Sequence, residues 1–239
     1  MIGVLELTDR RERKPQVEVR GLMGLRCLWA ATPASENLRE KRRLRRVCRG
    51  AEALARGGSR RVLTAPAFPY WDVLRQAGLR PVETETFCQA LAAPLTLAAL
   101  DRQGLRPERA SVLLSGRRVS HALFQAAELL CPRVRYLSVD AGAEGEELAA
   151  WLRAEFGAAV RPPEDAGADV ALCFGPEEAP GRTTFHLWGK APDLAGFVPI
   201  PAAGGLPAGL DRLPLLALLW EEGRIQVKQL RFLPPRPKD

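Results

Sequence analysis

The chain has few residues of the kinds that build metal sites, disulfide frameworks or stacking platforms. Only five of its 239 residues are cysteines, two are histidines and two are tyrosines. No Cys-x-x-Cys spacing or Cys/His cluster occurs, so neither a zinc site nor a disulfide framework is predicted. We expect most cysteines to be small buried hydrophobes. The aromatic share of 6% leaves no evident platform for stacking nucleic-acid bases.

Long hydrophobic runs are also missing. No segment has 18 consecutive apolar residues, so no transmembrane helix and no membrane partner are predicted. The first residues, MIGVLELTDRRERKP, lack the charge order of a signal peptide, and a cytoplasmic location is therefore expected. A hydrophobic share of 46% with 26% charged residues is typical of a globular protein.

Positive charge is concentrated at the beginning of the chain. The net charge is +7, whereas residues 1–61 alone carry 16 Lys and Arg against 7 Asp and Glu. The excess of Arg over Lys, with abundant Ala, Pro and Leu, is typical of a GC-rich bacterial genome, which accounts for part of the arginine count. A helix is predicted from the N-cap candidate Ser35 to the stop at Gly57 and Gly58.

The outer faces of this predicted helix are basic. They hold Arg39, Lys41, Arg42, Arg43, Arg45, Arg46 and Arg49. Two interpretations stay open at this point. The residues form either a solvated face on a sheet-covering helix or a footprint for phosphate groups or nucleic acid.

The rest of the chain alternates between strand and helix patterns. Strands are predicted at Ile2 to Leu7, Val62 to Ala65, Ser111 to Ser115, Val134 to Val139, Asp169 to Phe174, Thr183 to Trp188 and Phe197 to Ile200. Helices are predicted at Trp71 to Ala77, Phe87 to Arg102, Ser120 to Leu130, Gly145 to Phe156 and Leu213 to Glu221. Pro94 should kink or divide the second of these helices. Arg224 to Leu233 alternates polar and apolar residues, as an edge strand does.

This order predicts an α/β protein with two α/β halves. The second half should be a Rossmann-like parallel sheet flanked by helices, followed by a C-terminal helix and an edge strand. We expect an N-terminal α/β domain with the basic helix at 1–106 and a Rossmann-like domain at 107–205. The C-terminal helix, edge strand and tail then occupy 206–239.

Residues 110–175 carry a resemblance to a known superfamily. Gly116 follows the apolar run VLLS, and Asp140 ends the next apolar run, VRYLSVD, 24 residues later. This stretch resembles the NAD(P)-binding Rossmann superfamily, and the two-part layout of the chain is similar to that of shikimate-dehydrogenase-like enzymes. The resemblance implies NAD(P) as a cofactor, phosphates at the turn after Gly116 and a ribose contact at Asp140.

The turn after Gly116 departs from the superfamily pattern of G-x-G-x-x-G. Its sequence is GRRVSH, and Arg118 stands where the second glycine lets the backbone approach a pyrophosphate. The side chain of Arg118 opposes that approach. Arg117 and Arg118 could instead bind a phosphate through their guanidinium groups. Ser120 is predicted to cap the following helix, and with Gly116 it completes the expected phosphate-binding set.

Two further residues near this turn are candidates. Asp140 either contacts a ribose or starts a turn, since Asp favours both positions. His121 is the first candidate for acid–base chemistry because it opens the helix nearest to the predicted crevice. No G-x-S-x-G motif surrounds Ser115, so a hydrolase of that type is not predicted.

Three functions remain open from the sequence. The first is a non-catalytic or degenerate Rossmann-like protein that binds a nucleotide or another phosphate-bearing small molecule. The second is an NAD(P)-dependent oxidoreductase with an atypical phosphate turn. The third is an interaction or nucleic-acid-associated protein that uses the basic helix. The oligomeric state cannot be inferred from these patterns.

Overall fold

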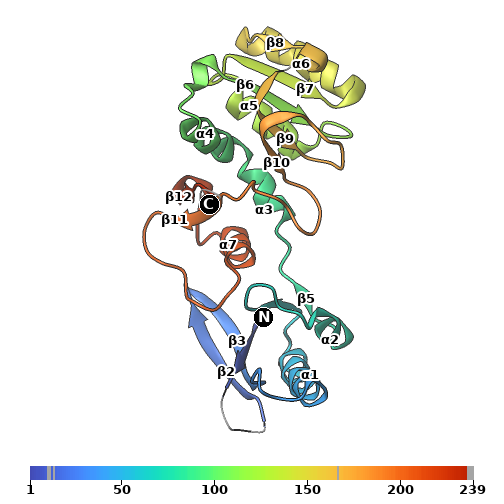
Figure 1. The fold of residues 1–239 in the computed structure, drawn as a ribbon, viewed down its shortest axis with the longest axis vertical. Coiled ribbons are helices and arrows are strands. Elements are labelled where there is room, and N and C mark those ends of the chain that lie inside the picture. The colour runs from blue at the N-terminus through green and yellow to red at the C-terminus, as the bar shows by residue number, and fades with distance from the viewer. Residues whose placement is uncertain (10–11, 13, 166, 236–239) are drawn as a thin grey trace. The chain divides into compact units, whose positions relative to one another are not determined.

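A computed structural model gives the fold and describes residues 1–9, 12, 14–165 and 167–235. The chain forms two compact units (Figure 1). The first contains Met1–Glu83 and Gly205–Ile225, and the second contains Thr84–Gly204 and the residues from Gln226 onward. Each unit has its own five-stranded sheet, so the two α/β halves do not share one.

The first unit is built on a mostly parallel sheet with the strand order β2-β3-β1-β4-β5. Only β2 runs antiparallel to its neighbour, β3. The elements of this unit are β1 (Ile2–Thr8), β2 (Gln16–Leu22), β3 (Leu25–Pro33), α1 (Glu40–Arg56), β4 (Arg61–Leu63), α2 (Trp71–Gln76), β5 (Arg80–Pro81) and α7 (Arg212–Glu221).

A two-residue turn joins β2 to β3. Leu22 pairs with Leu25, and both Met23 (φ 48°) and Gly24 (φ 84°) have positive φ. Such a turn matches the twist of a hairpin but usually contains Asn or Asp before the Gly. Because Met is rare in that conformation, the sequence did not reveal the hairpin.

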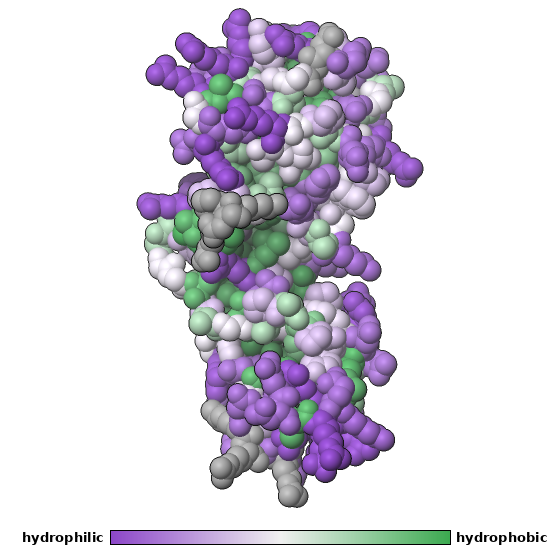
Figure 2. All heavy atoms as spheres, in the orientation of Figure 1, coloured by the Kyte–Doolittle hydropathy of each residue, from purple (hydrophilic) through white to green (hydrophobic). Residues whose placement is uncertain are grey.

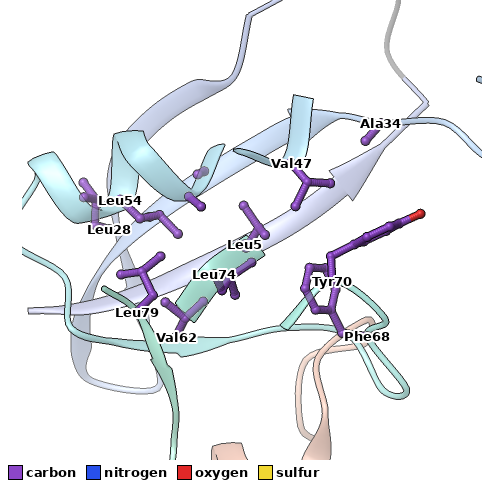
Figure 3. Close-up of a cluster of buried hydrophobic side chains, with 12 residues drawn as sticks. Leu5, Leu28, Ala34, Val47, Leu54, Val62, Phe68, Tyr70, Leu74 and Leu79 are labelled. Atoms are coloured by element: carbon purple, nitrogen blue, oxygen red, sulfur yellow. The ribbon is translucent and has the colours of Figure 1, made fainter. Parts of the chain in front are cut away.

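The core of the first unit lies between α1, α2 and one face of the sheet (Figure 3). Val47 and Leu54 of α1 point toward Leu5 of β1 and Leu28 of β3, and all four are at most 7% exposed. The helix itself begins at Glu40, so the prediction of Ser35 as its N-cap was wrong. Ser35 instead accepts hydrogen bonds from the backbone of the turn that precedes α1.

The second unit has an all-parallel sheet with the strand order β10-β9-β6-β7-β8. Counted along the chain, this order is that of the first five strands of a Rossmann fold, which confirms the predicted fold class. Its elements are α3 (Glu85–Ala90), α4 (Ala92–Arg102), β6 (Ser111–Ser115), α5 (His121–Leu130), β7 (Tyr136–Asp140), α6 (Gly142–Phe156), β8 (Val160–Arg161), β9 (Ala168–Cys173), β10 (Gly181–His186), β11 (Val198–Pro201) and β12 (Leu230–Leu233).

One face of this sheet lacks the helices that a doubly wound fold places there. The described residues between β8 and β9 form only a short 3-10 turn, Pro163–Asp165. The connection from β9 to β10 is a loop, and Ala179 of that loop packs on Leu113, Ala171 and Cys173. A thin loop layer therefore covers strand positions that carry small side chains.

The two units divide the chain differently from the expected domain boundaries. The division falls after Glu83 and not near 106, because α3 and α4 belong to the second unit. At the end of α4, Gln103 Nε2 donates hydrogen bonds to Asp169 O at 3.1 Å and to Thr183 Oγ1 at 3.0 Å. The apolar run at 87–102 is divided at Leu91, so that Pro94 lies in the first turn of α4, where its missing N–H has no cost.

The C-terminal segment 206–239 is also shared between the units. Helix α7 belongs to the first unit, where Asp211 N donates to Thr64 O at 2.8 Å and Glu221 pairs with Arg61. The predicted edge strand at 224–233 is shorter than expected, since Val227–Gln229 forms a 3-10 turn and only β12 is extended. β12 pairs antiparallel with β11 in a separate two-stranded sheet of the second unit.

The cysteines are all free, as the sequence suggested. Cys27, Cys88, Cys131 and Cys173 are buried, and only Cys48 is half-buried. Burial raises the pKa of Cys88 to about 12. Since the reactive species is the thiolate, buried thiols with raised pKa values react slowly.

We expect native protein at pH 8 to react with a chromophoric disulfide reagent at one thiol, Cys48, and at all five only after denaturation. A Cys48→Ser variant should lose the fast phase. Rapid labelling of two or more thiols in the native state would contradict this burial.

Raising the pH above about 9 should lower the free energy of unfolding, because the Cys88 thiol ionises more readily in the unfolded chain.

Candidate functional site

The predicted site residues lie at the carboxyl edge of the second sheet, where parallel strands end side by side. Gly116 N, just after β6, donates a hydrogen bond to Asp140 O at the end of β7 at 2.9 Å. On the other side of β6, Phe174 N donates to Ser115 O at 2.7 Å. The backbone therefore brings Gly116, Asp140 and Phe174 together, as the position of ligand crevices in such sheets requires.

Gly116 is needed for close packing in this structure. A Cβ atom at this position would lie 3.3 Å from Leu123 Cδ1 of α5 and 3.4 Å from Arg118 O. Its φ is not positive, so the glycine serves the approach of α5 to the end of β6. This packing of α5 against β6 would require a glycine at position 116 even if the protein bound no ligand.

Ser120 caps α5, as predicted. Its Oγ accepts a hydrogen bond from Leu123 N at 3.2 Å, and its backbone oxygen accepts one from Phe124 N at 2.9 Å. His121 is the first residue of the helix and is exposed. Ser115, at the end of β6, is fully buried, so its hydroxyl is not presented as a nucleophile.

A carboxylate from the next helix contacts the turn. Glu144 lies in the first turn of α6, and its Oε2 accepts a hydrogen bond from Val119 N at 2.9 Å. Val119 directly precedes the N-cap of α5, where a Rossmann protein directs backbone N–H groups at a phosphate. In this chain the Val119 N–H donates its hydrogen bond to the carboxylate of Glu144 and not to a ligand phosphate.

A second carboxylate lies near the beginning of the turn. Glu177 Oε2 is buried and has no hydrogen-bond partner among the described residues. A Cβ atom at Gly175 would lie 3.3 Å from Arg117 N and still closer to Glu177 Oε2, so both border the same small space. Asp140, at the end of β7, is exposed and accepts a backbone hydrogen bond from Gly116 N, so three acidic residues lie near the turn.

The two arginines of the turn face solvent. Arg117 and Arg118 are exposed, and in the part of the chain that the structure describes neither makes an ion pair. Their guanidinium groups are the only cationic groups of the predicted site. They remain available for a phosphate that approaches from outside the turn.

Sequence reasoning missed Glu144. The helix was predicted to begin at Gly145, whereas α6 begins at Gly142 and so includes Glu144 in its first turn. An acidic residue in the first turn of a helix is a recognisable pattern. Its partner, however, is 25 residues earlier in the chain, so only the fold reveals the contact.

The first unit holds a separate pocket of about 230 Å³ at the ends of β4 and β5. Its walls include Val62, Thr64, Phe68, Trp71, Pro81 and Asp211. Thr64 Oγ1 donates to Ala65 O, and Asp211 Oδ1 accepts from Leu213 N, so local backbone groups engage both polar side chains. The volume is below the roughly 300–1,000 Å³ of typical ligand pockets.

The described residues contain neither a cluster of metal ligands nor a helix able to span a membrane. No group of three or more His, Cys, Asp or Glu side chains there is placed to hold a metal ion. No described helix combines the length and the apolar character that crossing a membrane requires.

Comparisons with known proteins found only distant similarity. The chain matches no protein-family model, and no curated protein is significantly similar to it. Three solved structures match 72% of the chain at 15% identity. They are L-tryptophan dehydrogenase from Nostoc punctiforme (TM-score 0.29), ornithine carbamoyltransferase from Pyrococcus furiosus (0.27) and a shikimate dehydrogenase in complex with NADP+ (0.28).

The chain spans 55%, 58% and 65% of the lengths of these proteins, respectively, which is less than two thirds in each case. The strand order of the second sheet, and not these likenesses, therefore carries the fold assignment: the second unit has a Rossmann-like fold.

Proposed function

We propose that the chain is a degenerate Rossmann-like protein that binds a phosphate-bearing small molecule and transfers no hydride. The observation that carries this proposal is the hydrogen bond from Val119 N to Glu144 Oε2 at 2.9 Å. A pyrophosphate seated at the entrance of α5 would have to displace this carboxylate and would also meet the side chain of Arg118. A dinucleotide held in the usual way is therefore disfavoured.

Arg117 and Arg118 supply the binding capacity in this proposal. Both side chains are exposed and free of ion pairs within the described structure. Their consecutive positions in the chain allow both guanidinium groups to reach one terminal phosphate. The ligand would then lie outside the turn and not on its backbone. Glu144 and Asp140 would repel a second, deeper phosphate by like charge.

His121, the acid–base candidate of the sequence, is not oriented for proton transfer by a neighbouring group in the described structure. His121 is exposed, and no hydrogen bond of its side chain occurs in the described structure. A general base needs a defined orientation toward its proton, usually through a second hydrogen bond. This supports a binding function over an oxidoreductase.

Thermal-shift measurements with NAD+, NADP+ and ATP test the proposal. We expect ATP to raise the melting temperature, since a ligand at ten times its Kd stabilises a protein by about 1.4 kcal/mol. NAD+ has no terminal phosphate and should give no shift at the same concentration, whereas NADP+ should bind the two arginines only through its terminal 2′-phosphate. An Arg117→Gln/Arg118→Gln variant should lose the ATP shift, because the guanidinium groups bind the phosphate.

The matched control is Arg109→Gln/Arg133→Gln, which removes two exposed arginines elsewhere in the same unit. It should keep the shift. The absence of any ATP effect would contradict phosphate binding. An NADP+ shift accompanied by reduction of the nucleotide with any alcohol or amino-acid substrate would contradict the loss of dinucleotide chemistry.

A further inference from the structure

The outer face of α1 carries a row of arginines that the proposed site does not use. Arg42, Arg45 and Arg49 are spaced by three and four residues, so they lie on one side of the helix, and all three are exposed. Arg39 and Lys41 flank them and are also exposed. We call these five residues the basic row. Figure 2 shows strongly hydrophilic side chains gathered where Figure 1 draws α1.

The structure separates the basic row from the other arginines of α1. Arg43 lies over the ring of Tyr70 at 5.3 Å, and Arg46 Nη1 donates to Pro33 O at 2.7 Å, so both serve the fold of the first unit. In the described structure, by contrast, no member of the basic row forms an ion pair. Glu52, the acidic residue nearest along this face, has its carboxylate turned to Cys48 Sγ.

The basic row weakens the helix that carries it. Arg39 is the N-cap, and Lys41 and Arg42 lie in the first turn, where the positive end of the helix dipole repels cations. Arg42 and Arg49 each stand within four residues of Arg45, a spacing that places like charges next to one another. Glu40 is the one acidic residue of the first turn, and none stands between Arg42 and Arg49, whereas alternating charges are typical of a solvated helix face. The arrangement therefore points to an anionic partner.

The length of the basic row and its arginine content indicate which kind of anionic partner it can bind. The row extends from residue 39 to residue 49, which is about 15 Å along a helix. Double-stranded nucleic acid presents phosphates densely and regularly over such a length, and arginine binds phosphate through two parallel hydrogen bonds. We propose that the basic row binds the phosphate backbone of a nucleic-acid duplex without reading its bases.

Two other anionic partners fit the structure less well. A helix that lies in a membrane surface needs a free apolar face, but Val47, Ala51 and Leu54 of α1 are fully buried in the core of the first unit. An acidic protein partner would need an apolar anchor at the centre of the contact. Leu44, at 36% exposed, is the only large hydrophobic side chain of α1 that reaches the surface.

Fluorescence anisotropy of the full chain with 20-base-pair DNA and RNA duplexes tests the proposal. We expect binding at 50 mM salt that weakens steeply by 200 mM. An Arg42→Gln/Arg45→Gln/Arg49→Gln variant should lose at least tenfold in affinity, and its salt slope should fall by about 2–3, since each lost phosphate contact removes roughly 0.9. The control is Arg106→Gln/Arg109→Gln/Arg133→Gln, which removes the same charge from exposed positions of the second unit.

A melting curve distinguishes a binding role from a structural one. The α1 triple variant should melt at the same temperature as the unchanged chain or higher, because repulsion along the helix is relieved. A lower melting temperature together with lost binding would overturn the proposal. So would equal losses in the two triple variants, failure of the unchanged chain to bind either duplex at 50 mM salt, or tighter binding to phosphatidylserine vesicles than to duplexes. These outcomes are independent of the phosphate site at Arg117 and Arg118.

Discussion

A Phe185→Ala variant is expected to lose about 3–5 kcal/mol of unfolding free energy, the range for removing a fully buried aromatic ring. Phe185 lies on β10, is 0% exposed and is among the largest fully buried side chains. Its ring packs against that of Phe197, with centroids 5.7 Å apart. Phe185 is in register with Leu172, so it lies on the face of the sheet opposite the loop layer. The loss combines the transfer of the ring to water with the cavity that its removal leaves there.

Urea denaturation followed by circular dichroism measures this loss. Because the chain has two compact units, the transition assigned to the second unit should shift more than any transition of the first. Leu129→Ala, at a position 50% exposed on α5 of the same unit, is the control and should change stability by about 0.5 kcal/mol or less. A Phe185→Ala variant as stable as this control would contradict the described core.

The second large effect is expected at Gly50, where α1 crosses β3 in the first unit. A Cβ atom there would lie 2.9 Å from Leu5 Cδ1 and closer still to Thr32 Oγ1. Thr32 is fully buried and branched at Cβ, so it cannot turn away without moving the strand. We therefore expect Gly50→Ala to cost about 1–3 kcal/mol, although alanine is the better helix former.

Gly21→Ala provides the matched comparison in the same unit. Gly21 lies on the exposed strand β2, and a Cβ atom there would meet nothing within 4 Å. The replacement should leave the melting temperature unchanged or raise it slightly, because it restricts the unfolded chain. A Gly50→Ala variant that melts as high as Gly21→Ala would show that α1 does not approach β3 as described.

Much of the fold could be predicted because its signals are local. The apolar runs at β6, β7 and β9 alternate with amphipathic helices, and this alternation predicts a parallel sheet. The boundary between the units could not be predicted in the same way. The run at 87–102, which contains α4 and the second half of α3, is mostly apolar, which predicts that it is buried but not in which unit.

For the candidate site, too, the local features could be predicted and the contacts between distant residues could not. The sequence placed Gly116, Ser120 and Asp140 at one edge of one sheet, because each directly follows a predicted strand or opens a helix. It identified the interruption of the glycine pattern by Arg118. It did not show that the amide of Val119 already has a partner, because nothing near that residue in the sequence indicates Glu144.

The amino-acid sequence by itself determined the α/β class, the Rossmann-like alternation and the basic face of α1, because each follows from residue periodicity within one element. Only the tertiary structure decided which amide meets which carboxylate and that Arg43 and Arg46 of α1 contact other parts of the first unit. Those outcomes depend on contacts between residues far apart in the chain, such as Val119 with Glu144 and Gly50 with Thr32. Such contacts form only when the strands have taken their order in the sheet.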